Sequence, residues 1–118
     1  MERRKFLRFA AELDVEYRML GKRLAEGNAI SRNLSRDGIG IMANQAFPQS
    51  GDVELKVNIP GDNVPIFATG NIVWVRTVKS NKSAADVGIR FVKIDGFDRS
   101  RILEFVYDKW LSTIKKAR

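Results

Sequence analysis

Hydrophobic and polar residues alternate in several short runs along the chain, and these runs predict strands. From Leu13 to Met19 every odd position is apolar and every even position is charged, which is the period of a strand with one buried face. A second alternating run covers 53–59, and a longer β-branched and aromatic run covers 66–78, where Gly70 indicates a bulge or a bend. Shorter or more polar strands are expected at 24–34, 38–43 and 87–91, with a loop at 79–83. Six short strands separated by turn residues are typical of a small antiparallel β-barrel.

The hydrophobic period changes near the end of the chain, from two residues to three or four. This change, at Phe97, predicts an amphipathic helix over 97–117 with Asp95 or Asp98 as its N-cap. We expect its apolar stripe to cover an open end or a seam of the barrel. The two tryptophans, on a strand and on this helix, are expected to pack in the core or between helix and barrel. The stripe consists of Ile102, Leu103, Val106, Trp110, Leu111 and Ile114.

Length and composition favour a single domain that covers residues 1–118. The chain is 44% hydrophobic and 30% charged, close to the average of globular proteins, and 118 residues are enough for one core without disulfides or a structural metal. We expect residues 11–95 to form the barrel and 1–10 to form a mobile arm ahead of it. We see no internal repeat and no linker.

The residue types that the chain lacks exclude several functions. The sequence has no His and no Cys, so Ser-His-Asp and Cys-His centres and imidazole or thiolate metal sites are excluded. We therefore expect no enzyme, no catalytic residues, no metal and no cofactor. The absence of cysteine favours a reducing, cytoplasmic setting. The longest uncharged stretch, 38–51, is too short and too polar to span a membrane.

The positive charge of the chain is concentrated at its two ends. The net charge is +7, of which +3 lies in 1–8 and +4 in 99–118, whereas 9–98 is neutral. A net positive charge favours an anionic partner such as a nucleotide, a nucleic acid or a membrane surface. Because the body is neutral, however, the pattern differs from the broad basic face of a general nucleic-acid binder.

Two polar segments carry the residues best suited to bind such an anion. The first, 3–8, brings arginines ahead of the first strand, and the second, 33–38, joins the second strand to the third. One guanidinium can bind two phosphate oxygens at once, stack on a base, or donate hydrogen bonds to the acceptors of guanine. Asn33 offers a donor and an acceptor to a base edge, Ser35 a hydroxyl to a phosphate, and Gly38 space for a ligand. The same residue types also suit an ordinary β-turn.

These segments match a pair of family motifs. The sequence RKFLR at 4–8 fits RxxxR, and NLSRDG at 33–38 fits [D/N]xSxxG. RxxxR alone is a weak signal in an arginine-rich chain, but the two motifs in this order and separation are specific. With GNIVW at 70–74 and VGIRF at 87–91, which are similar to two further strands of the family, the chain resembles the PilZ domain, the bacterial receptor family for cyclic di-GMP, over nearly its whole length.

The resemblance implies a mainly β fold, a six-stranded antiparallel barrel with a C-terminal α-helix, that binds cyclic di-GMP on the outside of the barrel. The arm would close over the ligand and create a new surface for a downstream protein; motility, pilus, exopolysaccharide and chemotaxis machinery are settings that family membership suggests. In the family, the residue at the position of Arg3 helps to decide whether one or two ligands bind. The ligand-binding residues that the resemblance implies are Arg3, Arg4, Arg8, Asn33, Ser35 and Gly38.

Two other functions stay open. A small barrel with net charge +7 also suits a protein that binds single-stranded nucleic acid. Such proteins need exposed aromatic residues, whereas the aromatic residues here fall mainly on inward strand positions or on the helix stripe, so nucleic acid is the weaker expectation. The third function is a ligand-free adaptor of the same fold, and the intact arginine and NxSxxG positions argue against it.

Overall fold

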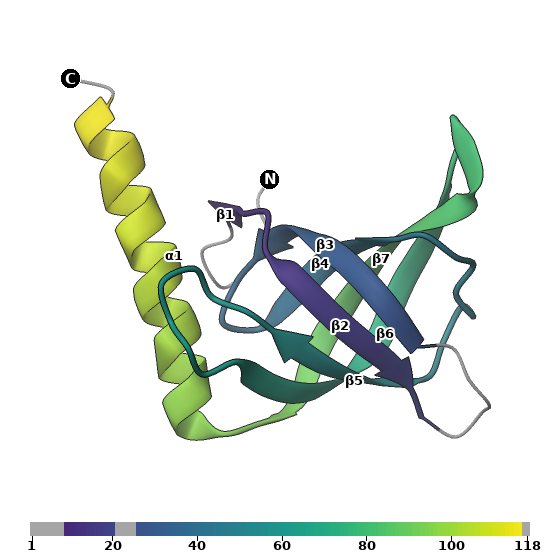
Figure 1. Ribbon diagram of the computed structural model, residues 1–118, viewed down its shortest axis with the longest axis horizontal. Helices are drawn as coiled ribbons and strands as arrows, with labels where there is room; N and C mark the ends of the chain where they lie inside the picture. The colour runs from purple at the N-terminus through teal and green to yellow at the C-terminus, as the bar shows by residue number, and fades with distance from the viewer. Residues whose placement is uncertain (1–8, 21–25, 117–118) are drawn as a thin grey trace.

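The computed structural model describes residues 9–20 and 26–116, and within them lie seven strands and one helix. Strands β2 to β7 form a closed antiparallel barrel in the order β3-β2-β5-β6-β7-β4, closed by the pairing of β3 with β4 (Figure 1). The short strand β1 adds to β3 outside this barrel. The elements are β1 Phe9–Ala10, β2 Asp14–Met19, β3 Glu26–Leu34, β4 Gly38–Ala43, β5 Asp52–Val57, β6 Ile66–Val78, β7 Asn81–Ile94 and α1 Gly96–Lys116.

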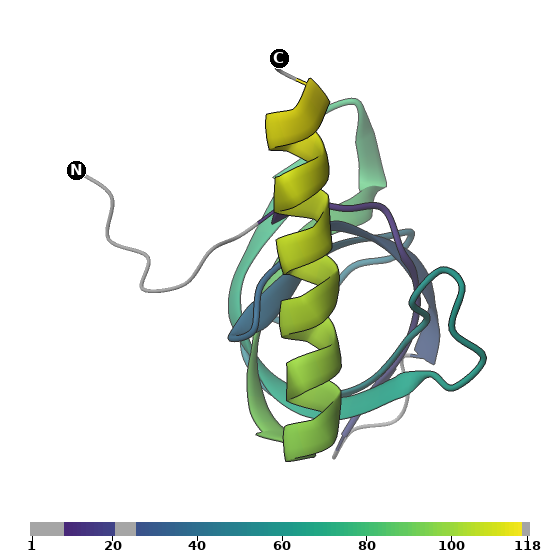
Figure 2. The same cartoon turned by 90° about the vertical axis from the view of Figure 1, so that its left-hand side faces the viewer.

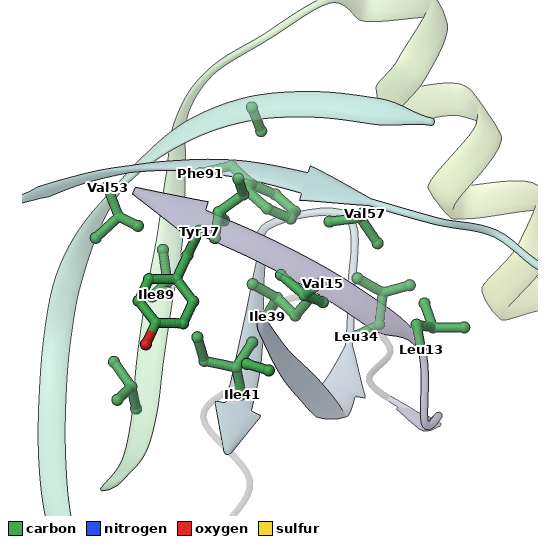
Figure 3. Close-up of a cluster of buried hydrophobic side chains, with 14 of the residues drawn as sticks. Leu13, Val15, Tyr17, Leu34, Ile39, Ile41, Val53, Val57, Ile89 and Phe91 are labelled. Atoms are coloured by element: carbon green, nitrogen blue, oxygen red, sulfur yellow. The ribbon is translucent and has the colours of Figure 1, made fainter. Parts of the chain in front are cut away.

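The interior of the barrel is filled by the apolar positions of the alternating runs. Val15, Tyr17 and Met19 of β2 are buried while the residues between them are exposed, which confirms the strand predicted there. Figure 3 shows side chains from β2, β3, β4, β5 and β7 meeting inside the barrel. The ring of Tyr17 lies 4.9 Å from that of Phe47. The mainly β, six-stranded prediction is therefore confirmed.

The hairpin of β6 and β7 is longer than the sequence predicted. The register shifts next to Gly70, which confirms the predicted bulge; a Cβ atom at Gly70 would lie 2.5 Å from Cγ2 of Ile89. The loop predicted at 79–83 is wrong from Asn81 onward, because β7 begins there and extends to Ile94. This extension is held by backbone pairing and by Asn81, whose side-chain oxygen accepts hydrogen bonds from Ser83. Because these bonds hold it, this part of β7 forms a strand without alternating apolar residues.

Helix α1 lies across one open end of the barrel (Figure 2). Asp95 caps it, since its Oδ1 accepts a hydrogen bond of 2.8 Å from the N–H of Phe97, and this confirms one of the two predicted caps. Ile102 and Val106 are buried at 0% and 3% exposure and belong to the core cluster. They seal this end of the barrel.

The prediction of one apolar stripe packed on the barrel was wrong for three of its six residues. Leu103, Trp110 and Ile114 are exposed. Leu103 projects about 100° around the helix from Ile102, whereas Trp110 and Ile114 lie beyond Val106, which is the last buried residue in the described part of the helix. The prediction that Trp110 packs between helix and barrel was therefore wrong as well. The other tryptophan, Trp74, is half-buried and lies against Gly88, where an added Cβ atom would come within 2.3 Å of the indole ring.

Candidate functional site

Strand β1 brings the start of the described chain to the turn that follows β3. Phe9 pairs with Leu34 and Ala10 with Asn33 in an antiparallel register. Phe9, which follows the first candidate segment in the sequence, therefore lies beside the second one, since the 33–38 segment begins opposite Ala10. Arg3, Arg4 and Arg8 themselves lie outside the described residues.

A buried serine fastens the chain between β1 and β2 to β3. Ser31 is fully buried, and its hydroxyl accepts a hydrogen bond of 2.8 Å from the N–H of Leu13 and donates one to the carbonyl of Ala11. The N–H of Ala11 donates to the carbonyl of Arg32. These bonds fix where the N-terminal segment leaves the barrel.

The hydroxyl of Ser35 organises the turn between β3 and β4. Its oxygen accepts hydrogen bonds from the backbone N–H groups of Asp37 at 3.1 Å and Gly38 at 3.2 Å, and the N–H of Ser35 donates to the carbonyl of Gly38 at 3.0 Å. Ser35 is only 2% exposed. In this structure the hydroxyl shapes the turn, as in the ordinary β-turn interpretation of these residues.

Gly38 is required by the neighbouring strand. It lies opposite Arg90 of β7, and a Cβ atom added to it would lie 2.4 Å from the carbonyl oxygen of Ile89. The N–H of Phe91 also donates a hydrogen bond of 2.9 Å to the carbonyl of Asp37. The close approach that the sequence indicated at this glycine is therefore an approach of strand β7.

The side-chain oxygen of Asn33 lacks a hydrogen bond to any described residue. Asn33 is half-buried and lies over Gly40, where a Cβ atom would come within 2.9 Å of its Oδ1. Within the described part of the chain this buried oxygen has no hydrogen-bond partner. An unpaired buried acceptor costs about 1–3 kcal/mol, so a donor at this place would be favourable.

Three arginines outside the N-terminal segment surround the turn, and the sequence assigned none of them to the site. Arg36 belongs to the turn itself and is half-buried, and Arg90 is exposed beside Gly38. Arg99 of helix α1 donates a hydrogen bond of 2.8 Å to the carbonyl of Arg36. Arg90 stands in the VGIRF run, which indicated a strand only, and nothing local to Arg99 indicates which loop the helix touches. The turn at 33–38 contains one carboxylate, Asp37, so the three guanidinium groups give the site a net positive charge.

A hollow in the described part of the chain lies elsewhere. It has a volume of about 430 Å³ and opens on the outer face of β2, β5, β6 and β7. Four of its charged side chains form ion pairs: Arg18 donates to Glu54 at 3.0 Å, and Lys56 lies 3.3 Å from Glu16. The turn at 33–38 does not line it, so we place the candidate site at the turn, where a buried acceptor and positive charge coincide.

The described residues show neither a metal centre nor a membrane-spanning helix. No group of three or more acidic, histidine or cysteine side chains within 9–20 and 26–116 could hold a metal ion. In the same part of the chain, no helix is both long enough and apolar enough to cross a membrane.

The fold and the site define a small closed β-barrel with a positively charged turn beside its N-terminal entry. The family model of the PilZ domain matches residues 2–108, and the chain belongs to this family. No curated protein matched the chain in a comparison of sequences.

Solved structures share the fold at low sequence identity. The PilZ domain of YcgR from Escherichia coli with c-di-GMP is 15% identical with a TM-score of 0.72, and the match covers 98% of both chains. The inhibitor of motility MotI/DgrA from Bacillus subtilis is 19% identical with a TM-score of 0.78, over 95% of this chain and 53% of that one. The MrkH–c-di-GMP complex from K. pneumonia is 17% identical with a TM-score of 0.74, over 98% and 56%. This chain thus spans about half the length of MotI and MrkH.

Proposed function

We propose that this protein is a receptor for cyclic di-GMP that binds the nucleotide between its N-terminal arginines and the turn at 33–38. The observation that supports the proposal is the pairing of Phe9, which directly follows the RxxxR segment in the sequence, with Leu34 of the NxSxxG segment. Membership of the PilZ family and two similar structures with c-di-GMP bound support it.

The site residues have complementary roles in this proposal. Arg4 and Arg8, with Arg3 beside them, bind the two phosphates and stack on or pair with guanine. Asn33 offers its unpaired Oδ1 to the donors of a guanine edge. Ser35 and Gly38 act by holding the turn in shape against β7.

Binding changes the surface of the protein because it orders a charged segment. Four positive charges within residues 1–8 repel one another, and two phosphates remove that repulsion. The segment then closes over the ligand at the barrel surface and presents a new face to a downstream protein. We assign the protein no catalytic role, no metal and no cofactor, and we place this function in the cytoplasm.

Calorimetric titration of cyclic di-GMP into the whole chain tests the proposal. We expect saturable binding that GMP and cyclic di-AMP do not reproduce, and no detectable binding to the double variant Arg4→Ala, Arg8→Ala. The matched control is Arg18→Ala, Arg76→Ala, which removes the same charge from exposed ion pairs with Glu54 and Asp86. This control should change the affinity by less than about twofold.

Other outcomes identify the competing functions. Binding that falls steeply with salt and shows no preference for guanine would indicate a nucleic-acid binder. A folded protein that binds none of the nucleotides would indicate a ligand-free adaptor. Either outcome refutes the receptor.

A further inference from the structure

Helix α1 carries a second apolar face that the barrel does not cover. The barrel contacts the face of Ile102 and Val106. The second face, which we call the outer stripe, consists of Leu103, Tyr107, Trp110 and Ile114, with exposed fractions of 44%, 52%, 36% and 39%.

The outer stripe runs along a part of the helix that the barrel does not support. Beyond Val106 no described helix residue is fully buried, yet the helix continues to Lys116. Figure 1 shows this part of α1 leaning away from the body of the barrel. Helices in proteins gain most of their stability from packing of an apolar face, so a second apolar face left in water on this helix favours a partner.

The spacing of the outer stripe indicates that this partner is another helix. Its four residues follow one another at intervals of four, three and four, the a and d positions of a heptad repeat. A membrane surface fits poorly, because membrane-binding helices have a basic polar face. From Gly96 to Lys116 the helix carries five positive and three negative residues. Two of the positive residues, Lys115 and Lys116, lie at its very end, so the length of the polar face over 96–114 carries equal numbers of both signs.

The order of the side chains points to a second copy of this chain in the antiparallel orientation. The stripe reads aliphatic, aromatic, aromatic, aliphatic, and is symmetric about the point between Asp108 and Lys109. A two-fold axis there places Leu103 against Ile114 of the second copy and Tyr107 against Trp110 of the second copy. We propose that the protein dimerises through this antiparallel pairing of outer stripes, an isologous contact.

Three features favour this arrangement over a parallel one. Tyr107 and Trp110 already touch, with ring centroids 5.7 Å apart, so the two copies form one cluster of four rings. A parallel pair would instead stack the two Trp110 rings in one layer. The helix dipoles are opposed only in the antiparallel pair. Glu104 beside the stripe then faces the half-buried Leu111 of the second copy, so like charges do not meet.

Sedimentation equilibrium of the ligand-free chain tests the dimer. A seam of two heptads is small, so we expect a micromolar dissociation constant and twice the monomer mass of 13.4 kDa at about 300 µM. Trp110→Glu should be a monomer at that concentration, and so should the milder Trp110→Ala, with barrel melting unchanged. Ser112→Glu, which adds the same charge to an exposed position off the stripe, should dimerise as the wild type does. A wild-type monomer at about 300 µM, or dimers in both stripe variants, overturns the proposal.

Disulfide trapping tests the orientation, because the chain contains no cysteine of its own. Leu103→Cys and Ile114→Cys, each made separately and joined to tags of different size, are mixed and oxidised. We expect the cross-link between the two variants to predominate. Predominance of links between like variants would indicate parallel helices and refute the antiparallel contact.

Discussion

Arg99 of helix α1 donates a hydrogen bond of 2.8 Å from its Nη1 to the backbone carbonyl of Arg36, in the turn between β3 and β4. The two residues lie 63 positions apart in the sequence. This bond joins the helix that closes the barrel to the turn that we propose as the ligand site. The shape of the turn therefore depends on the position of the helix.

Arg99→Ala should weaken the binding of cyclic di-GMP although Arg99 is not proposed to touch the ligand. A hydrogen bond from a charged donor contributes about 1.5–3 kcal/mol, and without it the turn is free to adopt other conformations. We expect the affinity to fall roughly tenfold, which corresponds to about 1.4 kcal/mol, and Arg99→Lys to restore part of it. Titration calorimetry measures both.

Arg101→Ala is the matched control on the same helix. Arg101 hydrogen-bonds to Asp62, Asp98 and the carbonyl of Val64. The N–H of Val64 and the Arg101 guanidinium hold the pKa of Asp62 below its usual value. This substitution should lower the melting temperature and leave ligand affinity unchanged. Equal effects of the two substitutions on affinity would show that Arg99 acts only through general stability.

Alanine at two glycines of β4 should separate folding from binding. At Gly38 the new Cβ atom would meet the backbone carbonyl of Ile89 at 2.4 Å, so the strands must shift and we expect a loss of about 1–3 kcal/mol of stability. At Gly40 it would meet the Asn33 amide at 2.9 Å, and a side-chain end moves more easily than a strand. We expect Gly40→Ala to weaken ligand binding at a smaller cost in stability. Urea unfolding and calorimetry distinguish the two, and the reverse order would contradict this account.

Ser31→Ala should be strongly destabilising for a change of one atom. It leaves the buried N–H of Leu13 and the carbonyl of Ala11 without their partner, and each such group costs about 1–3 kcal/mol. We expect the free energy of unfolding to fall by about 2–4 kcal/mol. Ser100→Ala, on the exposed face of the helix, should change it by less than about 0.5 kcal/mol.

Tyr17 should make the protein less stable in alkali. Burial raises its pKa above the ordinary value of 10.0, and the hydrogen bond from Gln45 opposes this in part. The raised pKa means that the unfolded chain loses the phenolic proton first, so the contribution of Tyr17 is complete below pH 10 and is lost as the pH rises above it. Unfolding by urea at about pH 8 and about pH 11 should show a smaller alkaline loss in Tyr17→Phe than in the wild type. Equal losses in both proteins would contradict the assignment.

The sequence by itself determined the strands of the barrel and the motif residues of the candidate site. Alternation such as that of Leu13 to Met19 is a local property, because only a strand places every second side chain on one face, and β2 follows it residue by residue. The capping of the helix by Asp95 is local in the same way. The motif residues Asn33, Ser35 and Gly38 were found for this reason as well, since they share one turn.

The tertiary structure alone decided which distant residues complete the site and which faces stay open. Arg99 reaches the turn, and Gly38 needs to be glycine, only because closure of the barrel sets helix α1 and strand β7 beside that turn. Similarly, Ile102 and Trp110 follow the same helical period, so spacing cannot tell which of them meets the barrel. Local patterns fix which side chains share a face, whereas the docking of one element on another fixes what that face touches. The outer stripe of α1 became visible only once that docking was known.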